Sequence, residues 1–369
     1  MRLTVLMLIL AFTFNKVSAQ RFFVTKDTVI LERTLFGRST ADIKINSLCE
    51  NNTDYFMLAS IANVEGQSNR RFRQAVISIN KKNREVVVTP VPLLPDWSGK
   101  FQSLFVRNDS VILKRNPYYH DDYIDYTLTA EALSEATTDE EKADYDESLS
   151  LMHDYVLNPE TGQWAATGLA DDGIWDDKSF HVTWMCGGEF GNYIFFHSRH
   201  DANRYIYGWP DETDKTRMGG IRRIFRHKGR YYILGRKGLF TITDPESGCK
   251  YDGTPLYKQQ SHSAMETLIS LPSDSSTAFV TAFVSKRKIY VITTENHSMY
   301  LYMVGGRQLT KVADLEFDIQ ETFETGAEIR QNNRPADEAI ADIRSYNSRQ
   351  RCLMTIDGNK IKITCFIIK

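Results

Sequence analysis

Short strand–turn–strand segments recur along the whole chain, and this pattern limits the possible fold more than any other feature. In each segment, two runs of β-branched and aromatic residues flank a short polar turn. The turns are expected at Lys26-Asp27, Asn108-Asp109, Asp201-Ala202-Asn203, Lys228-Gly229, Lys237-Gly238, Ser285-Lys286, Asn296-His297 and Asp357-Gly358. Asp-Gly is the strongest hairpin dipeptide among them. The pattern predicts an all-β protein built from consecutive hairpins.

A second repeated element lies beside these hairpins. The motif NPETG at Asn158–Gly162 and the motif DPESG at Asp244–Gly248 each separate two strand-like runs. In both, Asn or Asp caps the turn, Pro presets φ, and Gly takes the left-handed position. Residues Val76–Val88 and Tyr300–Val312 are looser versions. Outer hairpins that alternate with inner ones are typical of four-stranded blades.

On these two turn motifs and this alternation, the chain resembles a secreted β-propeller. The resemblance is architectural, covers most of residues 20–369, and implies a single domain of six or seven blades. A large β-sandwich is the alternative fold. The C-terminal strand IKITCFIIK is expected to pair with the N-terminal RFFVTKD strand, which would close the ring and remove free sheet edges. The single Trp175-Asp176 dipeptide does not repeat, so no specific propeller family is assigned.

Two segments interrupt the hairpin pattern and are interpreted as small helical inserts near 127–151 and 317–350. The first is acidic and poor in β-branched residues. In the second, Ala336, Ile340 and Ile343 are spaced so that they would share one helical face.

The N-terminus predicts export. Arg2 precedes the mostly apolar run Leu3–Phe14, which is too short to span a bilayer, and Val17-Ser18-Ala19 supplies small residues for cleavage. A signal peptide is therefore expected over residues 1–19, with a mature periplasmic or extracellular chain from Gln20. No Cys follows the cleavage site, so no lipoprotein anchor is expected. No other stretch is apolar enough for a transmembrane segment.

The cysteines are few and scattered, which argues against a zinc ribbon or a dense disulfide framework. They are Cys49, Cys186, Cys249, Cys352 and Cys365. In an oxidising compartment they allow one or two disulfides, and free thiols remain the alternative.

The charge pattern argues against a nucleic-acid partner. Without Arg2 and Lys16, the chain carries 43 basic and 47 acidic residues. Nine Lys or Arg residues and no acidic residue lie between Lys215 and Lys237, but strand alternation would turn these charges outward from a core face. An anionic partner such as an acidic glycan, or the acidic segment Asp121–Glu147 of the chain itself, fits this stretch better than nucleic acid.

The candidate ligand-binding residues are polar or aromatic and lie in or near turns. They are Trp175, Trp209, His197, His200, Asp201 and Arg204. The two Trp residues have polar, turn-rich surroundings and are expected to be exposed, where they could stack on sugar rings. Trp164 and Trp184 are expected in blade interfaces. The imidazoles and the carboxylate could bind a metal, but their spacing fits a polar hairpin end, so no metal site is assigned.

No sequence motif of a known catalytic or nucleotide-binding type is present: HExxH, GxSxG, the P-loop and GxGxxG are all missing. No catalytic residue and no cofactor is assigned. The sequence favours an exported, non-enzymatic β-propeller that binds a protein or glycan partner. The alternatives are a glycan-active propeller enzyme, either hydrolase or lyase, and a scaffold subunit of an envelope assembly.

Overall fold

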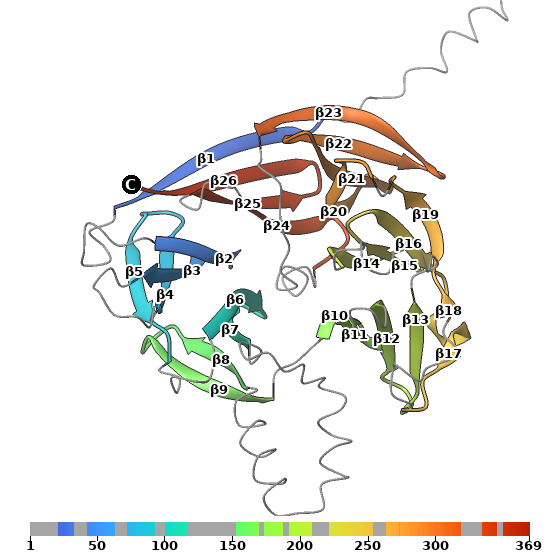
Figure 1. Ribbon diagram of the computed structural model, residues 1–369, viewed down its shortest axis with the longest axis horizontal. Helices are drawn as coiled ribbons and strands as arrows, with labels where there is room; N and C mark the ends of the chain where they lie inside the picture. The colour runs from blue at the N-terminus through green and yellow to red at the C-terminus, as the bar shows by residue number, and fades with distance from the viewer. Residues whose placement is uncertain are drawn as a thin grey trace, which may run out of the picture.

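The hairpins of the sequence combine into six sheets that surround a common centre like the blades of a propeller (Figure 1). A computed structural model describes residues 21–32, 43–62, 72–92, 100–116, 153–169, 173–186, 192–208, 221–253, 263–272, 274–318, 334–344 and 350–369. The predicted all-β propeller is confirmed, with six blades rather than seven. A ring of separate sheets excludes the β-sandwich alternative.

We number the blades in chain order and give the strands of each from the centre outward. Blade 1 contains β2 (Ile43–Glu50), β3 (Asp54–Ala62), β4 (Phe72–Asn80) and β5 (Val86–Pro90). Blade 2 contains β6 (Lys100–Arg107), β7 (Ser110–Asn116), β8 (His153–Asn158) and β9 (Gln163–Leu169). Blade 3 contains β10 (Gly173–Asp176), β11 (Phe180–Cys186), β12 (Asn192–Ser198), β13 (Arg204–Gly208), β17 (Cys249–Lys250) and β18 (Ser263–Ala264). Blade 4 contains β14 (Arg223–His227), β15 (Arg230–Leu234), β16 (Gly238–Ile242) and β19 (Glu266–Ser270). Blade 5 contains β20 (Ala278–Ser285), β21 (Lys288–Glu295), β22 (Ser298–Gly305) and β23 (Gln308–Asp318). Blade 6 contains β24 (Glu338–Arg344), β25 (Gln350–Asp357), β26 (Lys360–Ile368) and β1 (Phe23–Leu31).

The two ends of the described chain meet in blade 6 and close the ring. Strand β1 pairs with β26 in parallel along its whole length, from Phe23 opposite Lys360 to Leu31 opposite Ile368. This confirms the predicted closure. The turn expected at Lys26-Asp27 is wrong, because β26 supplies a continuous partner that keeps this dipeptide extended within β1.

The chain leaves blade 4 between β16 and β19 and adds two short strands, β17 and β18, to the edge of blade 3. The NPETG motif joins β8 to β9 as the outer hairpin of blade 2, as predicted. The DPESG motif is different: it forms a 3-10 turn at Pro245–Ser247 that leads from β16 of blade 4 to β17 on the edge of blade 3. The Tyr207 hydroxyl of blade 3 donates to the carbonyl oxygens of Asp244 and Pro245 at 3.2 and 3.1 Å, which holds the crossing in place.

The predicted helix around Ala336, Ile340 and Ile343 is wrong. Residues Glu338–Arg344 form β24, the innermost strand of blade 6. Side chains 339–343 are buried on both faces, so the apolar residues follow no strict alternation, and their spacing also matched a helical face. The other expected insert, 127–151, lies outside the described residues.

Side chains on inner strands bind the backbone of the next inner strand. The Ser47 hydroxyl of β2 accepts from the Leu104 N–H of β6 at 3.1 Å. The Arg223 guanidinium of β14 donates to the Ala282 carbonyl of β20 at 2.6 Å. These bonds satisfy backbone groups on the inner strand edges, which pair with no further strand.

A buried ion pair forms the same kind of joint between blades 6 and 1. Asp342 of β24 accepts hydrogen bonds from Arg351 of β25, and the side-chain exposures are 1% and 6%. Asp342 also accepts from the Leu48 N–H at 3.0 Å, and Arg351 donates to the Ile45 carbonyl at 2.9 Å, both on β2. Each charge is thus paired and further hydrogen-bonded, as a buried ion pair requires.

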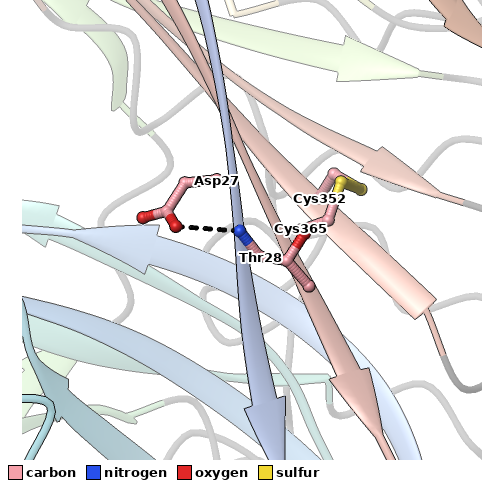
Figure 2. Close-up of a disulfide and its surroundings, with 4 residues drawn as sticks. All are labelled: Asp27, Thr28, Cys352 and Cys365. Carbon is pink, nitrogen blue, oxygen red and sulfur yellow. Dashed lines mark hydrogen bonds between the residues drawn. A yellow bond between two sulfur atoms is a disulfide. The ribbon is translucent and has the colours of Figure 1, made fainter.

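A disulfide joins Cys352 of β25 to Cys365 of β26, which face each other directly in the ladder (Figure 2). Thr28 of β1 lies opposite Cys365 on the other side of β26, so the disulfide sits beside the closing strand. Cys49 and Cys249 carry free thiols. In the parts of the chain that the structure covers, no helix has the length and apolar character needed to cross a membrane.

Candidate functional site

The candidate residues that the structure describes all lie in blade 3. Trp175 is on β10 and His197 on β12, while His200 and Asp201 form the β12–β13 turn that leads to Arg204 on β13. Trp209 lies outside the described residues. The Asp201-Ala202-Asn203 turn is confirmed, because the Ser198 N–H donates to the Asn203 carbonyl at 2.9 Å.

Trp175 is buried, contrary to the expected exposure. Only 6% of its surface is accessible, and its ring meets the ring of Tyr231 edge to face, with 5.5 Å between centroids. Blade 4 packs directly against this part of β10 and covers the indole. Trp164 and Trp184 are partly buried and pack against interblade clusters, as expected.

A carboxylate, an imidazole and a guanidinium lie together at the end of blade 3 that holds the β10–β11 and β12–β13 turns. We call this end the turn end of blade 3. Asp176 Oδ1 accepts from His181 Nδ1 at 2.8 Å and from Arg199 Nη2. Burial alone would raise the pKa of Asp176, but the bonds from His181 and Arg199 outweigh it and lower that pKa. The three side chains are between one quarter and one half exposed, so a ligand could reach them.

His197 extends this network along the sheet face. It lies directly opposite His181 in the β11–β12 ladder, and the ring centroids are 5.6 Å apart. His197 Nε2 lies 2.8 Å from the Thr183 hydroxyl. Burial, followed by electrostatic repulsion from His181 and Arg204, lowers the pKa of His197 to about 4. His197 is therefore neutral at physiological pH.

The adjacent Asp177 connects this end of blade 3 to blade 4. Its Oδ2 accepts from the Tyr231 hydroxyl at 2.8 Å and from Arg226 Nη1 at 3.2 Å. Its Oδ1 accepts from the N–H groups of Ser179 and Phe180, which fixes the β10–β11 turn. Burial, reinforced by the bond to Asp177, raises the pKa of Tyr231. We call Asp176, His181, Thr183, His197 and Arg199 the blade 3 network.

His200, Asp201 and Arg204 are exposed at the rim of the blade 3 network. Asp201 accepts from the Asn203 N–H at 3.0 Å, and the Arg204 guanidinium lies over the Tyr251 ring at 5.6 Å. Within the described part of the chain, no group of three His, Cys, Asp or Glu side chains is placed to hold a metal ion.

Sequence reasoning missed Asp176, His181 and Arg199 as site residues. The pairing of β11 with β12 would have placed His181 beside His197, but the connection GGEFG at 187–191 has three Gly residues and so leaves the register of the hairpin open. Arg199 lies in sequence between the candidate residues His197 and His200, so it could have been included as a candidate on that ground alone.

The inner hairpin turns of blades 4 and 5 bring cationic side chains to the same end of the ring. Inner strands of neighbouring blades run side by side, so the turns that follow β14 and β20 are neighbours (Figure 1). All of the following are exposed: Arg226, Lys228, Arg230, Lys286, Arg287 and Lys288. We call these six residues the basic turns. The only ion pair formed by these side chains with a described residue joins Arg226 to Asp177 at 3.2 Å.

No protein-family model matches the chain, and no curated protein does. Among solved structures, a post-proline cleaving enzyme from Rickettsia typhi is similar at 10% identity and a TM-score of 0.34, over 87% of this chain and 43% of that enzyme. A Pyrococcus horikoshii acylaminoacyl peptidase has 10% identity and a TM-score of 0.34, over 87% of this chain and 50% of the peptidase. A mannose phosphorylase from Leishmania mexicana has 9% identity and a TM-score of 0.28, over 97% of this chain and 91% of the phosphorylase. The chain thus spans no more than half the length of the two peptidases.

Proposed function

We propose that the protein is an exported, non-enzymatic binding protein that recognises a protein or glycan partner through the turn end of blade 3. The observation that carries this proposal is the blade 3 network: it holds charged and polar side chains, partly exposed, in two hydrogen-bonded groups that adjoin where His181 lies opposite His197. Side chains that are already oriented lose little freedom when a ligand binds them.

The carboxylates on the inner strands favour binding over glycoside cleavage. Cleavage needs one carboxylic acid with a raised pKa and a second carboxylate nearby. The inner strands in the described residues carry Glu50, Asp176, Glu338 and Asp342, and each pairs with a cation. The pKa of Asp176 is lowered, because its bonds to His181 and Arg199 outweigh burial. Asp176 is therefore suited to hold a cation in place rather than to donate a proton.

The disulfide supports the proposed export. Disulfides persist in oxidising compartments such as the periplasm and the cell exterior. The Cys352–Cys365 pair therefore agrees with the signal peptide expected over residues 1–19 and with a periplasmic or extracellular location.

A scaffold role in an envelope assembly is the second candidate. The large hydrophobic side chains that are exposed in the described residues lie on outer strands of blades 5, 6 and 1. They are Phe23, Ile30, Val87, Val88 and Val312. Apolar residues on strand edges can pair with another chain.

The test is a ligand screen of the mature chain from Gln20 against glycans and envelope proteins, followed by two single variants. Arg199→Ala should weaken binding of the true ligand by about tenfold, since a partly buried charged contact contributes on the order of 1–2 kcal/mol. Lys360→Ala, at the opposite end of the ring, should leave it unchanged. A ligand that binds the Arg199→Ala variant as well as the wild type would contradict the proposal. Crosslinks on β1, β5 or β23 would favour the scaffold role instead.

A further inference from the structure

The two basic turns share a geometry that places cations at their tips. Lys286 and Arg287 both have positive φ, 47° and 65°, and Lys228 has φ of 48° before Gly229. Each turn joins an inner strand to the next strand with two residues, as in a type I′ hairpin. The two turns follow β14 and β20, which contact each other as the inner strands of neighbouring blades (Figure 1).

Lys286-Arg287 is an unfavourable choice for this turn. Both positions require the left-handed region, where Asn and Gly are preferred because most other side chains are strained there. The turns at Asn108-Asp109 and Asn296-His297 also have positive φ at both residues, and both begin with Asn. Blade 5 thus carries two long cationic side chains where the backbone alone would favour Asn-Gly.

The six exposed side chains of the basic turns all carry positive charge. Packed sheets lie about 10 Å apart, which is close to the screening length at physiological salt, so the charges on the two turns reinforce each other. Only Arg226 pairs with a described carboxylate, that of Asp177. The surface therefore attracts an anion that can extend across both blades.

The absence of apolar anchors among the basic turns favours a glycan over a protein. Protein interfaces have a central core of aromatic or apolar side chains. In the described residues, the large exposed hydrophobic side chains are on β1, β5 and β23, and none is on the turns after β14 and β20. A hydrophilic chain that carries regularly spaced negative charges needs no such core.

We propose that the basic turns of blades 4 and 5 bind an anionic polysaccharide, whose carboxylate or sulfate groups pair with Lys228, Arg230, Lys286, Arg287 and Lys288. This proposal rests on the binding role proposed above and assigns the ligand class and a second, adjacent contact surface. Binding of this kind releases counterions from the polysaccharide, so it weakens as the salt concentration rises.

The test compares wild type with the double variant Lys286→Asn, Arg287→Gly. Asn-Gly suits a type I′ turn, so this variant should be at least as stable as wild type, and lost binding cannot be attributed to unfolding. Binding to heparin and to polygalacturonate separates sulfate from carboxylate recognition. We expect the variant to bind the preferred polysaccharide about tenfold more weakly, with a shallower loss of affinity between about 50 and about 200 mM salt.

The matched control is Lys44→Asn, Lys360→Asn, which removes two exposed charges at the opposite end of the ring and should bind like wild type. The proposal is overturned if neither polysaccharide binds, if the turn variant binds as tightly as wild type, or if polyglutamate binds better than both polysaccharides. If neither polysaccharide binds but another ligand binds in a way that depends on Arg199, this inference is rejected and the proposed function stands.

Discussion

At the scale of single residues, His197 shows how position in a sheet sets chemistry. On a free chain an imidazole titrates near pH 6.5. In blade 3 the ring is partly buried, lies opposite His181 and is close to Arg204, so burial first and electrostatic repulsion from these two side chains second lower its pKa to about 4. The Thr183 hydroxyl provides a hydrogen-bonding partner that a neutral ring can use. The environment thus favours an uncharged His197.

This shift predicts a pH dependence of stability. Between pH 6.5 and about pH 4, the unfolded chain binds a proton at His197 that the folded chain does not bind. The contribution of His197 to the free energy of unfolding is therefore full above pH 6.5. It declines as the pH falls, by on the order of 3 kcal/mol at pH 4. Urea unfolding of the wild type and of His197→Asn at several pH values should show a steeper decline in the wild type.

The exposed His200 is the control for that experiment. Its imidazole has no hydrogen bond in the described structure and lies in a turn, so His200→Asn should follow the wild-type pH curve. If His197→Asn also follows the wild-type curve, the lowered pKa is contradicted.

At the scale of elements, β24 shows why local pattern and final structure can differ. Its apolar residues fit a helical spacing, but the strand is the innermost one of its blade and is buried on both sides. The residues of β24 do not themselves indicate that β25 will pair with the strand on one side and that β2 of blade 1 will pack on the other. The hairpin turns are different: the turns at Asn108-Asp109, Lys228-Gly229 and Asn296-His297 each contain Asn, Asp or Gly, which accept the left-handed backbone found there, so they could be predicted from sequence.

The joint between β24 and β2 predicts a large effect of mutation. Asp342→Ala leaves Arg351 buried without its carboxylate, which should lower the free energy of unfolding by about 3–5 kcal/mol. The double variant Asp342→Leu, Arg351→Met removes both charges and should recover part of that loss. Denaturant unfolding measures both changes.

The exposed pair Lys311–Asp314 provides the comparison on the same scale. Lys311→Ala should change the free energy of unfolding by less than about 1 kcal/mol, since solvent weakens exposed ion pairs. An Asp342→Ala effect as small as that of Lys311→Ala would show that the buried joint does not hold blades 6 and 1 together.

At the scale of the whole molecule, ring closure depends on residues from opposite ends of the sequence. Strand β1 covers the edge of β26, and Val29 and Leu31 enter the core shared by blades 6 and 1. Similarly, β17 and β18 lie between two strands of blade 4 in sequence but pair with β13, so they link blade 3 to blade 4. Contacts of this kind connect distant parts of the chain, so the six blades should unfold as one unit.

Two substitutions within β1, one at a buried residue and one at an exposed residue, test how much this strand stabilises the closed ring. Leu31 is 1% exposed, so Leu31→Ala should destabilise the fold by about 2–5 kcal/mol and lower the melting temperature. Phe23 is 57% exposed, so Phe23→Ala should change stability by less than about 0.5 kcal/mol. Calorimetry compares the two. Equal, small effects would mean that β1 contributes little to closure.

Features that depend on neighbours in the chain were determined by the sequence itself: the all-β class, the two-residue turns and the hairpin alternation that produces blades. Turn preference and side-chain alternation act over a few residues, so they are readable from the sequence. Features that depend on packing between blades were decided only by the tertiary structure: the burial of Trp175 against Tyr231, the strand state of β24, the passage of the DPESG turn to blade 3, and the meeting of His181 with His197. These contacts form between segments whose separation in sequence carries no information about their distance in space.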